Sequence, residues 1–262
     1  MTAVTLTAPA AASGARPLGR RLWNVVRLHL ANPFTIFGTP LIVVASIFAI
    51  NWMIWWIIRT VAPSDPESID DVSQGFQYSG ASLWVFVYMM VIAIMAMNLT
   101  FSFALGFGST RRDFALGTHL TFVGLAALYA LIYTLLSGLE TWTDGWGMGG
   151  AMFNSLYFGV DAPWGLRMFH VFAAFLFFFA IGSAFGAMYV RWKAKGLIIF
   201  FSLLAIALIG AAALATVTAS WGAVGEFFVT VGFTGGYALS LAISAVAALA
   251  SYLVLRRATP RG

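Results

Sequence analysis

The sequence predicts an all-α integral membrane protein with six transmembrane helices, and three observations support this fold class. First, 61% of the 262 residues are hydrophobic, only 9% are charged, and the mean hydropathy is +0.91. A soluble domain has about half apolar and about a quarter charged residues. Second, the chain contains long apolar runs of about 20 residues, each enough to cross about 30 Å of hydrocarbon as a helix. Third, the few charges fall mainly between these runs.

The spans are expected to be helices because lipid cannot hydrogen-bond with an open backbone, and the runs are too long and too uniformly apolar for barrel strands. The expected spans are 39–58, 82–105, 114–136, 164–190, 196–219 and 235–255. The whole chain then divides into a disordered tail (1–17), an amphipathic helix (18–33), a transmembrane domain (34–258) and a short tail (259–262).

The charges predict the orientation of the spans. Six spans put both termini on one side, where 12 of the 14 Lys and Arg residues then fall, whereas eight of the nine acids fall on the other side. Basic residues mark the cytoplasmic side, so both termini are expected there. Topology and anionic lipid account for the basic pI, and no nucleic-acid partner is expected. An aromatic belt is expected at the outer ends, from Trp52, Trp55, Trp56, Trp142, Trp146, Trp164 and Trp221.

The segment 18–33 is a basic amphipathic helix suited to the inner membrane surface. Its apolar side consists of Leu18, Leu22, Val25, Val26 and His29. Its polar side holds Arg20, Arg21, Asn24 and Arg27, and Trp23 completes the set expected at the interface. Two interpretations remain open, a simple anchor on membrane lipids and a lever that touches a cytoplasmic partner.

The outer connections differ in character. Residues 60–80 are acidic and contain proline, which predicts a solvated loop. Residues 140–163 mix glycine with aromatic residues and are expected to pack on the outer surface. Residues 220–236 are apolar, bounded by glycines and too short to span, so a re-entrant outer hairpin is expected between spans five and six.

Glu226 is the single acid in that apolar outer segment. Burial of an ionised carboxylate without a partner is costly, so Glu226 must reach water, pair with a group such as Arg59 or Arg167, or be protonated. It is the candidate outer gate, and the alternative is an ordinary interfacial residue.

Catalytic motifs are absent from the sequence. There is no cysteine, no G-x-x-x-x-G-K-[ST] phosphate loop and no H-E-x-x-H motif, and the three histidines have no acids at metal-site spacing. We therefore expect no catalytic residue, metal or bound cofactor on this chain, and a membrane enzyme is the least favoured class.

The stretch GFGSTRRDFALGT (106–118) predicts a sharp cytoplasmic turn that starts a new helix. Gly106 and Gly108 can end the preceding span, since glycine tolerates a left-handed C-cap. Thr110 stands three residues before Asp113, which is capping-box spacing, and the acid suits the positive end of the helix dipole. Arg111 and Arg112 keep this turn on the inner side.

The same stretch resembles the lGxSRRdfxxGt turn between the second and third helices of ABC-transporter permeases of the type-2, six-helix exporter class. The segment GSAFGAMYVRWKAKGLIIFF is similar to the GxxxGxxyxRwGxxGll segment of that family, and YLVLRRA is similar to the end of many actinobacterial members. The resemblance covers residues from about 18 to 258, and Lys195 departs from it in a turn where relatives often carry Gly and Arg.

The resemblance implies a permease subunit in the bacterial cytoplasmic membrane that exports a hydrophobic or amphipathic substrate such as a drug, lipid or peptide. It implies two copies of a separate cytoplasmic ATPase, which would bind ATP and Mg, and a second copy of this chain or a similar permease. It also implies that the turn is the element that couples to the ATPase. The coupling residues would be Ser109, Thr110, Arg111, Arg112, Asp113 and Phe114.

Polar residues within the spans have two possible roles, hydrogen bonding between helices and lining of a transport path. They are Asn51, Asn98, His119 and His170. Gly182 and Gly186 form a GxxxG motif that predicts close helix packing, within one subunit or between two. A nucleotide-independent secondary transporter or channel is the alternative function. It would need ion-coupling acids inside the membrane, and the single acid of the inner half, Asp113, is expected at the surface.

Overall fold

The computed structural model describes residues 17–62, 65–159 and 162–258, and these residues form helices, turns and connections without a strand. The prediction of an all-α protein is confirmed. The expected tails, 1–17 and 259–262, lie outside the described residues except for Pro17. The elements in chain order are α1 (Leu18–His29), η1 (Phe34–Gly38), α2 (Thr39–Val61), α3 (Pro66–Phe76), α4 (Leu83–Gly106), α5 (Arg111–Trp142), η2 (Gly145–Gly149), η3 (Leu156–Phe158), α6 (Trp164–Val217) and α7 (Trp221–Arg256).

Five helical stretches are long and apolar enough to cross a membrane. They are Phe34–Val61, Leu83–Gly106, Arg111–Trp142, Trp164–Val217 and Trp221–Arg256. The two longest each contain one break in the helical backbone. Lys193 (φ 56°, ψ −154°) divides α6 into limbs 164–192 and 194–217, and Gly232 (φ 60°, ψ −178°) divides α7 into limbs 221–231 and 233–256. These helices are those of a membrane protein, as the composition predicts.

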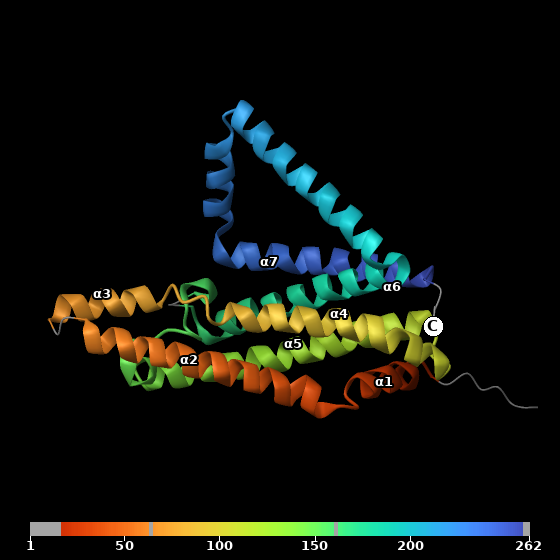
Figure 1. Ribbon diagram of the computed structural model, residues 1–262, viewed down its shortest axis with the longest axis horizontal. Helices are drawn as coiled ribbons and strands as arrows, with labels where there is room; N and C mark the ends of the chain where they lie inside the picture. Colours follow the sequence, from red (N-terminus) through yellow and green to blue (C-terminus); the bar gives the residue numbers. More distant parts are fainter. Residues whose placement is uncertain (1–16, 63–64, 160–161, 259–262) are drawn as a thin grey trace, which may run out of the picture.

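Most of the helices run along one common direction (Figure 1). The second limb of α6 leaves this bundle diagonally, and the first limb of α7 returns across the bundle direction before the second limb rejoins it. One end of the bundle holds α1, the α4–α5 turn, the break at Lys193 and the end of α7; we call it the basic end. The opposite end holds α3, η2 and η3. Segments far apart in the chain therefore meet at the basic end.

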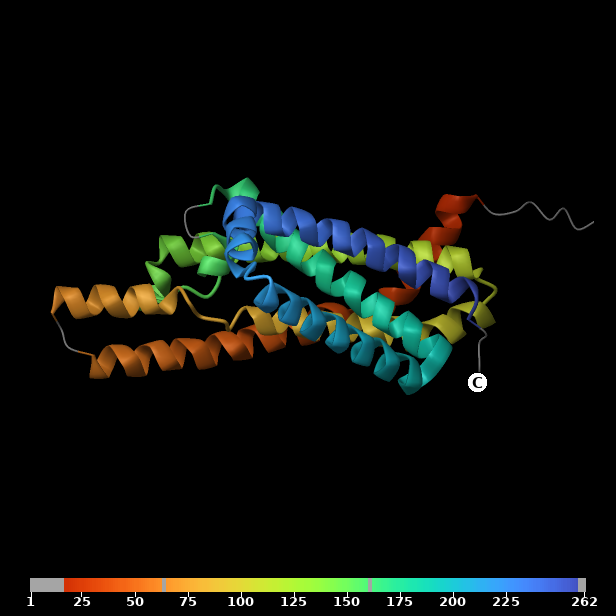
Figure 2. The same ribbon diagram turned by 90° about the horizontal axis from the view of Figure 1, so that it is seen from above.

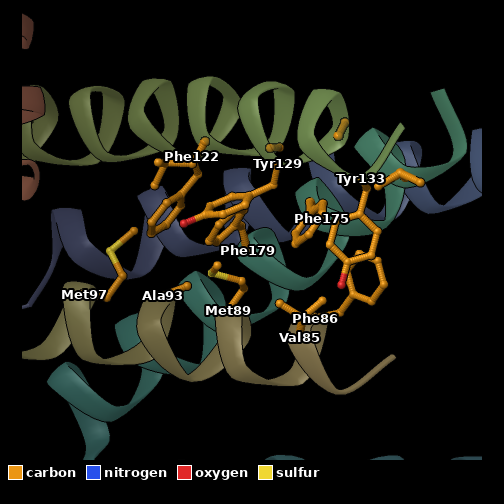
Figure 3. Packing of buried hydrophobic residues seen from close by; sticks show 14 of the residues in the cluster. Val85, Phe86, Met89, Ala93, Met97, Phe122, Tyr129, Tyr133, Phe175 and Phe179 are labelled. Carbon is orange, nitrogen blue, oxygen red and sulfur yellow. The ribbon is translucent and has the colours of Figure 1, made fainter. Parts of the chain in front are cut away.

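The core lies between α4, α5 and the first limb of α6 (Figure 3). Phe122 of α5 and Phe179 of α6 stack with ring centroids 4.9 Å apart. Gly182 and Gly186 bring α6 against α4: a Cβ atom on Gly182 would lie 2.4 Å from the carbonyl oxygen of Met90, and one on Gly186 would lie 2.6 Å from the Cβ atom of Met97. This GxxxG motif therefore packs two helices within one chain, which resolves the question that the sequence leaves open.

The acidic connection between the first two spans is partly helical, so the expectation of a solvated loop over 60–80 is wrong there. Asp65 caps α3 by accepting a hydrogen bond from the backbone N–H of Ser68 at 3.0 Å, and Pro66 occupies the first turn. An aspartate followed by proline is a strong helix start. That backbone N–H and the Ser68 hydroxyl hold the pKa of Asp65 below its usual value. Figure 2 shows α3 lying alongside the end of α2.

One of the expected belt tryptophans belongs to the core instead. Trp55 is 1% exposed, packs with a tilted ring against Phe76 of α3 (centroids 5.6 Å apart) and covers Gly150 of the second outer connection. The sequence could not reveal this because α3 itself was not expected. Trp146 is half-buried. The remaining members of the belt are exposed: Trp52, Trp56, Trp142, Trp164 and Trp221.

Candidate functional site

The α4–α5 turn at the basic end has well-formed caps on both sides. Gly108 is left-handed (φ 81°), and the N–H groups of Gly108 and Ser109 donate to the carbonyls of Leu105 and Ala104 at 3.0 and 3.1 Å. This pair of bonds is a Schellman motif, which requires a residue that tolerates positive φ. The predicted glycine C-cap is confirmed, at Gly108.

Helix α5 begins at the predicted N-cap. The Thr110 hydroxyl oxygen accepts the backbone N–H of Asp113 at 3.1 Å and donates to the Asp113 carboxylate at 2.7 Å. The carboxylate therefore bonds the cap side chain rather than the cap backbone N–H, so the expected capping box forms in only one of its two halves. The turn is set by local bonds alone, which explains why its sequence predicts it.

A long-range ion pair adds to these local bonds. Arg21 of α1 donates from Nε to Oδ2 of Asp113 at 2.9 Å, and its Nη2 contacts the same oxygen. The Asp113 side chain is only 4% exposed. Because a carboxylate at this depth needs a cationic partner, the pair ties α1 to the first turn of α5.

Helix α1 is held against α5 by packing as well. Val25 lies over Gly117, where a Cβ atom would come within 2.6 Å of the Cβ of Val25. The Thr118 hydroxyl donates to the carbonyl of Phe114, so it accepts the bond at 2.8 Å from Nε2 of His29. Burial lowers the pKa of His29 to about 4. The apolar side of α1 thus rests on protein at Val25, Val26 and His29.

The turn and α1 enclose an open hollow of about 440 Å³ at the basic end. Its walls are Arg21, Asn24, Phe107, Gly108, Ser109, Thr110 and Asp113. Arg112 is exposed beside it, whereas Arg111 donates from Nη1 to the carbonyl of Arg256 at 2.9 Å. Phe114 is fully buried, and its ring meets that of Phe101 edge-to-face with centroids 5.4 Å apart. Of the predicted coupling residues, Ser109, Thr110 and Arg112 therefore offer surface, while Asp113 and Phe114 anchor the turn.

The interfacial residues of α1 divide in the same way. Arg20, Trp23 and Arg27 are exposed, whereas Arg21 is engaged with Asp113. This helix therefore presents two arginines and one tryptophan outward while its remaining predicted interfacial arginine bonds within the protein.

The candidate gate Glu226 lies on the exposed first limb of α7. Its side chain forms no ion pair with any residue of the described ranges, so neither Arg59 nor Arg167 is its partner there. Arg167 instead contacts Ser137 and Asn154 through Nη1 and donates from Nη2 to the carbonyl of Gly159 at 3.2 Å. Of the three situations expected for Glu226, pairing with Arg59 or Arg167 is therefore not observed among the described residues.

The four predicted pathway residues occupy separate places. Asn51 lines a hollow of about 550 Å³ between α2 and α4, and His119 donates from Nε2 to the carbonyl of Ala248 on α7 at 3.1 Å. Asn98 is half-buried on α4, without a hydrogen bond to a described residue. His170 donates from Nδ1 to the carbonyl of Phe158 at 3.0 Å and accepts from the Thr234 hydroxyl at 3.1 Å. Among the described residues, no two of these four side chains are hydrogen-bonded to each other or line the same hollow.

Sequence reasoning missed the site of Glu140 at the opposite end. It was expected among the outer acids, yet it is 1% exposed and accepts bonds from the N–H groups of Met152, Phe153 and Asn154 at 3.0, 3.0 and 2.7 Å. The Trp146 indole donates to it at 3.0 Å. The glycine-rich GWGMGG stretch that follows Glu140 allows the chain to fold back around it, and this was the available signal.

The fold and these contacts define a helical membrane protein with a capped, basic turn braced against an amphipathic helix. Within the described ranges, no group of three or more potential metal ligands is present. Comparisons with protein-family models, curated proteins and solved structures found no match. A function therefore has to be argued from the geometry.

Proposed function

We propose that this chain is the membrane permease subunit of an ATP-driven exporter and that the α4–α5 turn is its contact with a separate cytoplasmic ATPase. The observation that carries the proposal is the bracing of this turn. Its caps, the Arg21–Asp113 pair and the seat of Val25 on Gly117 join the turn rigidly to α1 and to α5. A force on Ser109 or Arg112 would therefore move both helices as one body.

Transmission from such a contact needs a helix that reaches the far end of the protein. Helix α5 extends without a break from Arg111 to Trp142, and Glu140 in its last turn holds the outer connection through backbone bonds. Rigid-body movement of packed helices is a known way to convert a local contact into a global change. The geometry thus supports coupling between the two membrane surfaces.

The proposed topology has six spans. Limbs 164–192 and 194–217 of α6 are each long enough to cross the hydrocarbon on their own, since about 20 residues suffice. The first limb of α7, 221–231, is too short to cross and supports an outer helical segment at the membrane rather than a seventh span. Both termini would then lie at the basic end, on the cytoplasmic side.

An aromatic hollow supports a hydrophobic or amphipathic substrate. It measures about 710 Å³ and lies where α4, α6 and the broken α7 meet the outer connection. Phe86, Phe178 and Phe228 line it, together with Gly232 at the break and Tyr237. Such a wall binds apolar surface and offers few polar partners, so a charged hydrophilic solute is a poor fit. A second copy of this chain or a similar one would complete the transport path.

The absence of cysteine from the sequence allows a direct test of the ATPase contact. We expect Ser109→Cys to cross-link, in native membranes, to a protein that carries a phosphate-loop motif. Thr60→Cys, exposed at the opposite end of the bundle, is the matched control and should not cross-link to it. Cross-linking of both variants to the same protein, or of neither to any ATPase, would overturn the proposal.

A charge reversal then tests the coupling. Arg112→Glu should abolish stimulation of the partner's ATP hydrolysis, and Arg112→Lys should retain it, with insertion verified by protease protection. Arg111→Glu combined with Arg112→Glu is a less specific version, because Arg111 also bonds the end of α7. Unchanged stimulation in correctly inserted Arg112→Glu would exclude the turn as the coupling element. A secondary transporter would keep its transport rate after ATP depletion.

A further inference from the structure

A second hollow at the basic end is lined by three arginines from two helices. It measures about 440 Å³, and its walls are Arg191 of α6 with Leu253, Val254, Arg256 and Arg257 of α7. Arg191 and Arg256 lie 65 residues apart in the chain and meet because both helices end their apolar stretches at this point. None of the described residues that line the hollow carries a carboxylate.

The three guanidinium groups have no ionic partner among the described residues, so they can bind an anion. Within the described ranges, none of them forms an ion pair or donates a side-chain hydrogen bond. Arg191 lies over the ring of Trp192 at 4.6 Å and Arg256 over the ring of Tyr252 at 5.8 Å, so aromatic faces orient two of the three. Arginine forks match phosphate oxygens in geometry as well as charge.

The negative end of the α7 dipole does not compete for these groups. The carbonyls of Val254 and Leu255 accept the backbone N–H groups of Arg257 and Ala258 at 3.2 and 3.1 Å. The carbonyl of Arg256 accepts from the Arg111 side chain at 2.9 Å. These three carbonyls at the end of the helix are thus satisfied, and the neighbouring guanidinium groups remain available for an external anion.

We propose that this hollow, here called the arginine hollow, binds the phosphate of an anionic glycerophospholipid. Its remaining wall favours a lipid over a free anion. Leu253 is 47% exposed beside the arginines, and Trp192 is 45% exposed at the same level, as expected for a side chain at the lipid interface. An acyl chain can lie along Leu253 and Val254 while the phosphate meets the arginines. Basic pockets between membrane helices are known to hold acidic headgroups.

This binding site is independent of the proposed transport function. It predicts that anionic lipid joins the break at Lys193 to the end of α7, since Arg191 stands just before that break. A lipid in the arginine hollow would therefore stabilise the contact between α6 and α7, whether the protein is an exporter or belongs to another functional class.

The test uses the full chain in detergent, with phosphatidylglycerol added and bound lipid counted by native mass spectrometry. The test variant carries Arg191→Gln, Arg256→Gln and Arg257→Gln. The matched control carries Arg112→Gln, Lys193→Gln and Lys195→Gln, which removes three exposed positive charges from the same end without changing a residue that lines the hollow. We expect the test variant to bind phosphatidylglycerol at least tenfold more weakly than wild type, and the control less than threefold more weakly.

Further arms identify the anion. Phosphatidylcholine, which is neutral overall, should not compete with phosphatidylglycerol, and inorganic phosphate at 10-fold molar excess should not displace it. Displacement by inorganic phosphate would overturn the lipid as ligand.

The comparison of the two variants locates the site. Equal loss of bound phosphatidylglycerol in the test and control variants would show only a general attraction of charges, and full retention of the lipid by the test variant would exclude the arginine hollow. If the test variant no longer associated with the ATPase but still bound phosphatidylglycerol, the hollow would be a contact for a protein, and the proposal would be overturned. Melting temperatures of both variants control for folding, and Arg256→Gln alone serves if the triple variant does not fold.

Discussion

Arg21 and Asp113, 92 residues apart in the chain, form the ion pair that joins the amphipathic helix to the turn between α4 and α5. Arg21 is about one-third exposed at its side chain, whereas Asp113 is buried, so the two partners contribute unequally. Removal of the arginine leaves a buried carboxylate with only the Thr110 hydroxyl beside it. The stability of the turn and the docking of α1 therefore depend on each other.

This pair predicts an asymmetric mutational pattern. Arg21→Gln should destabilise the protein by about 1–3 kcal/mol, since it strands a buried charge. Asp113→Asn should cost less, because the arginine can reach water. Both effects are measured by thermal unfolding in detergent, with the exposed Arg20→Gln as control. A loss equal to that of Arg20→Gln would contradict a structural role for the pair.

His29 predicts a pH dependence for the docking of α1. Burial lowers its pKa to about 4 from an ordinary value of about 6.5, so the undocked helix binds the proton more readily. The contribution of neutral His29 is complete above pH 6.5 and is lost as the pH falls toward 4. A fluorophore on Leu22→Cys should report release of α1 over that range. In His29→Gln, which keeps a donor for Thr118, the transition should disappear; its persistence would assign it to another group.

The contact of α6 on α4 predicts a strict size limit at Gly182. A methyl group there would lie 2.4 Å from the backbone carbonyl of Met90, which cannot move aside as a flexible side chain would. Gly182→Ala should therefore cost about 1–3 kcal/mol in unfolding free energy. Gly124→Ala, where no atom lies within 4 Å, is the control and should be neutral or stabilising by up to about 1 kcal/mol. Similar melting temperatures for the two variants would argue against the packing described.

The break in α6 predicts opposite outcomes for two neighbouring lysines. Lys193 adopts φ 56° and ψ −154°, a region suited to glycine, whereas Lys195 is helical. Lys193→Gly should stabilise the protein by about 1 kcal/mol, and Lys195→Gly should destabilise it by roughly the same amount. Chemical unfolding of the two variants provides the comparison. Stabilisation by Lys195→Gly, or destabilisation by Lys193→Gly, would contradict the position of the break.

Glu226 provides a test of the proposed outer gate. Glu226→Gln and Glu226→Leu should leave folding unchanged, because the side chain is exposed and makes no ion pair with a described residue. We expect both to alter export from vesicles at matched protein levels, since the change of charge lies on the segment between the last two spans. Wild-type export by both variants would leave Glu226 as an ordinary interfacial residue.

Much of the candidate site was predictable because its determinants are local. Gly108 and Thr110 act on backbone groups within five residues, so the end of α4 and the start of α5 follow from the chain itself. The same holds for the apolar side of α1. Asp65 and Pro66 carry an equally local signal for α3, whereas the polar composition of that connection by itself predicts a loop.

The sequence by itself determined the class of the protein, the positions of its long apolar helices and the collection of its basic residues at their ends. Only the tertiary structure decided which residues meet: Arg21 with Asp113, Trp55 with Phe76, and Glu140 with the backbone of 152–154. The physical reason is the distance along the chain over which each interaction acts. Hydropathy and capping act over a few residues and can be read along the chain, whereas burial of a charge or an aromatic ring depends on partners that the fold brings together from distant segments.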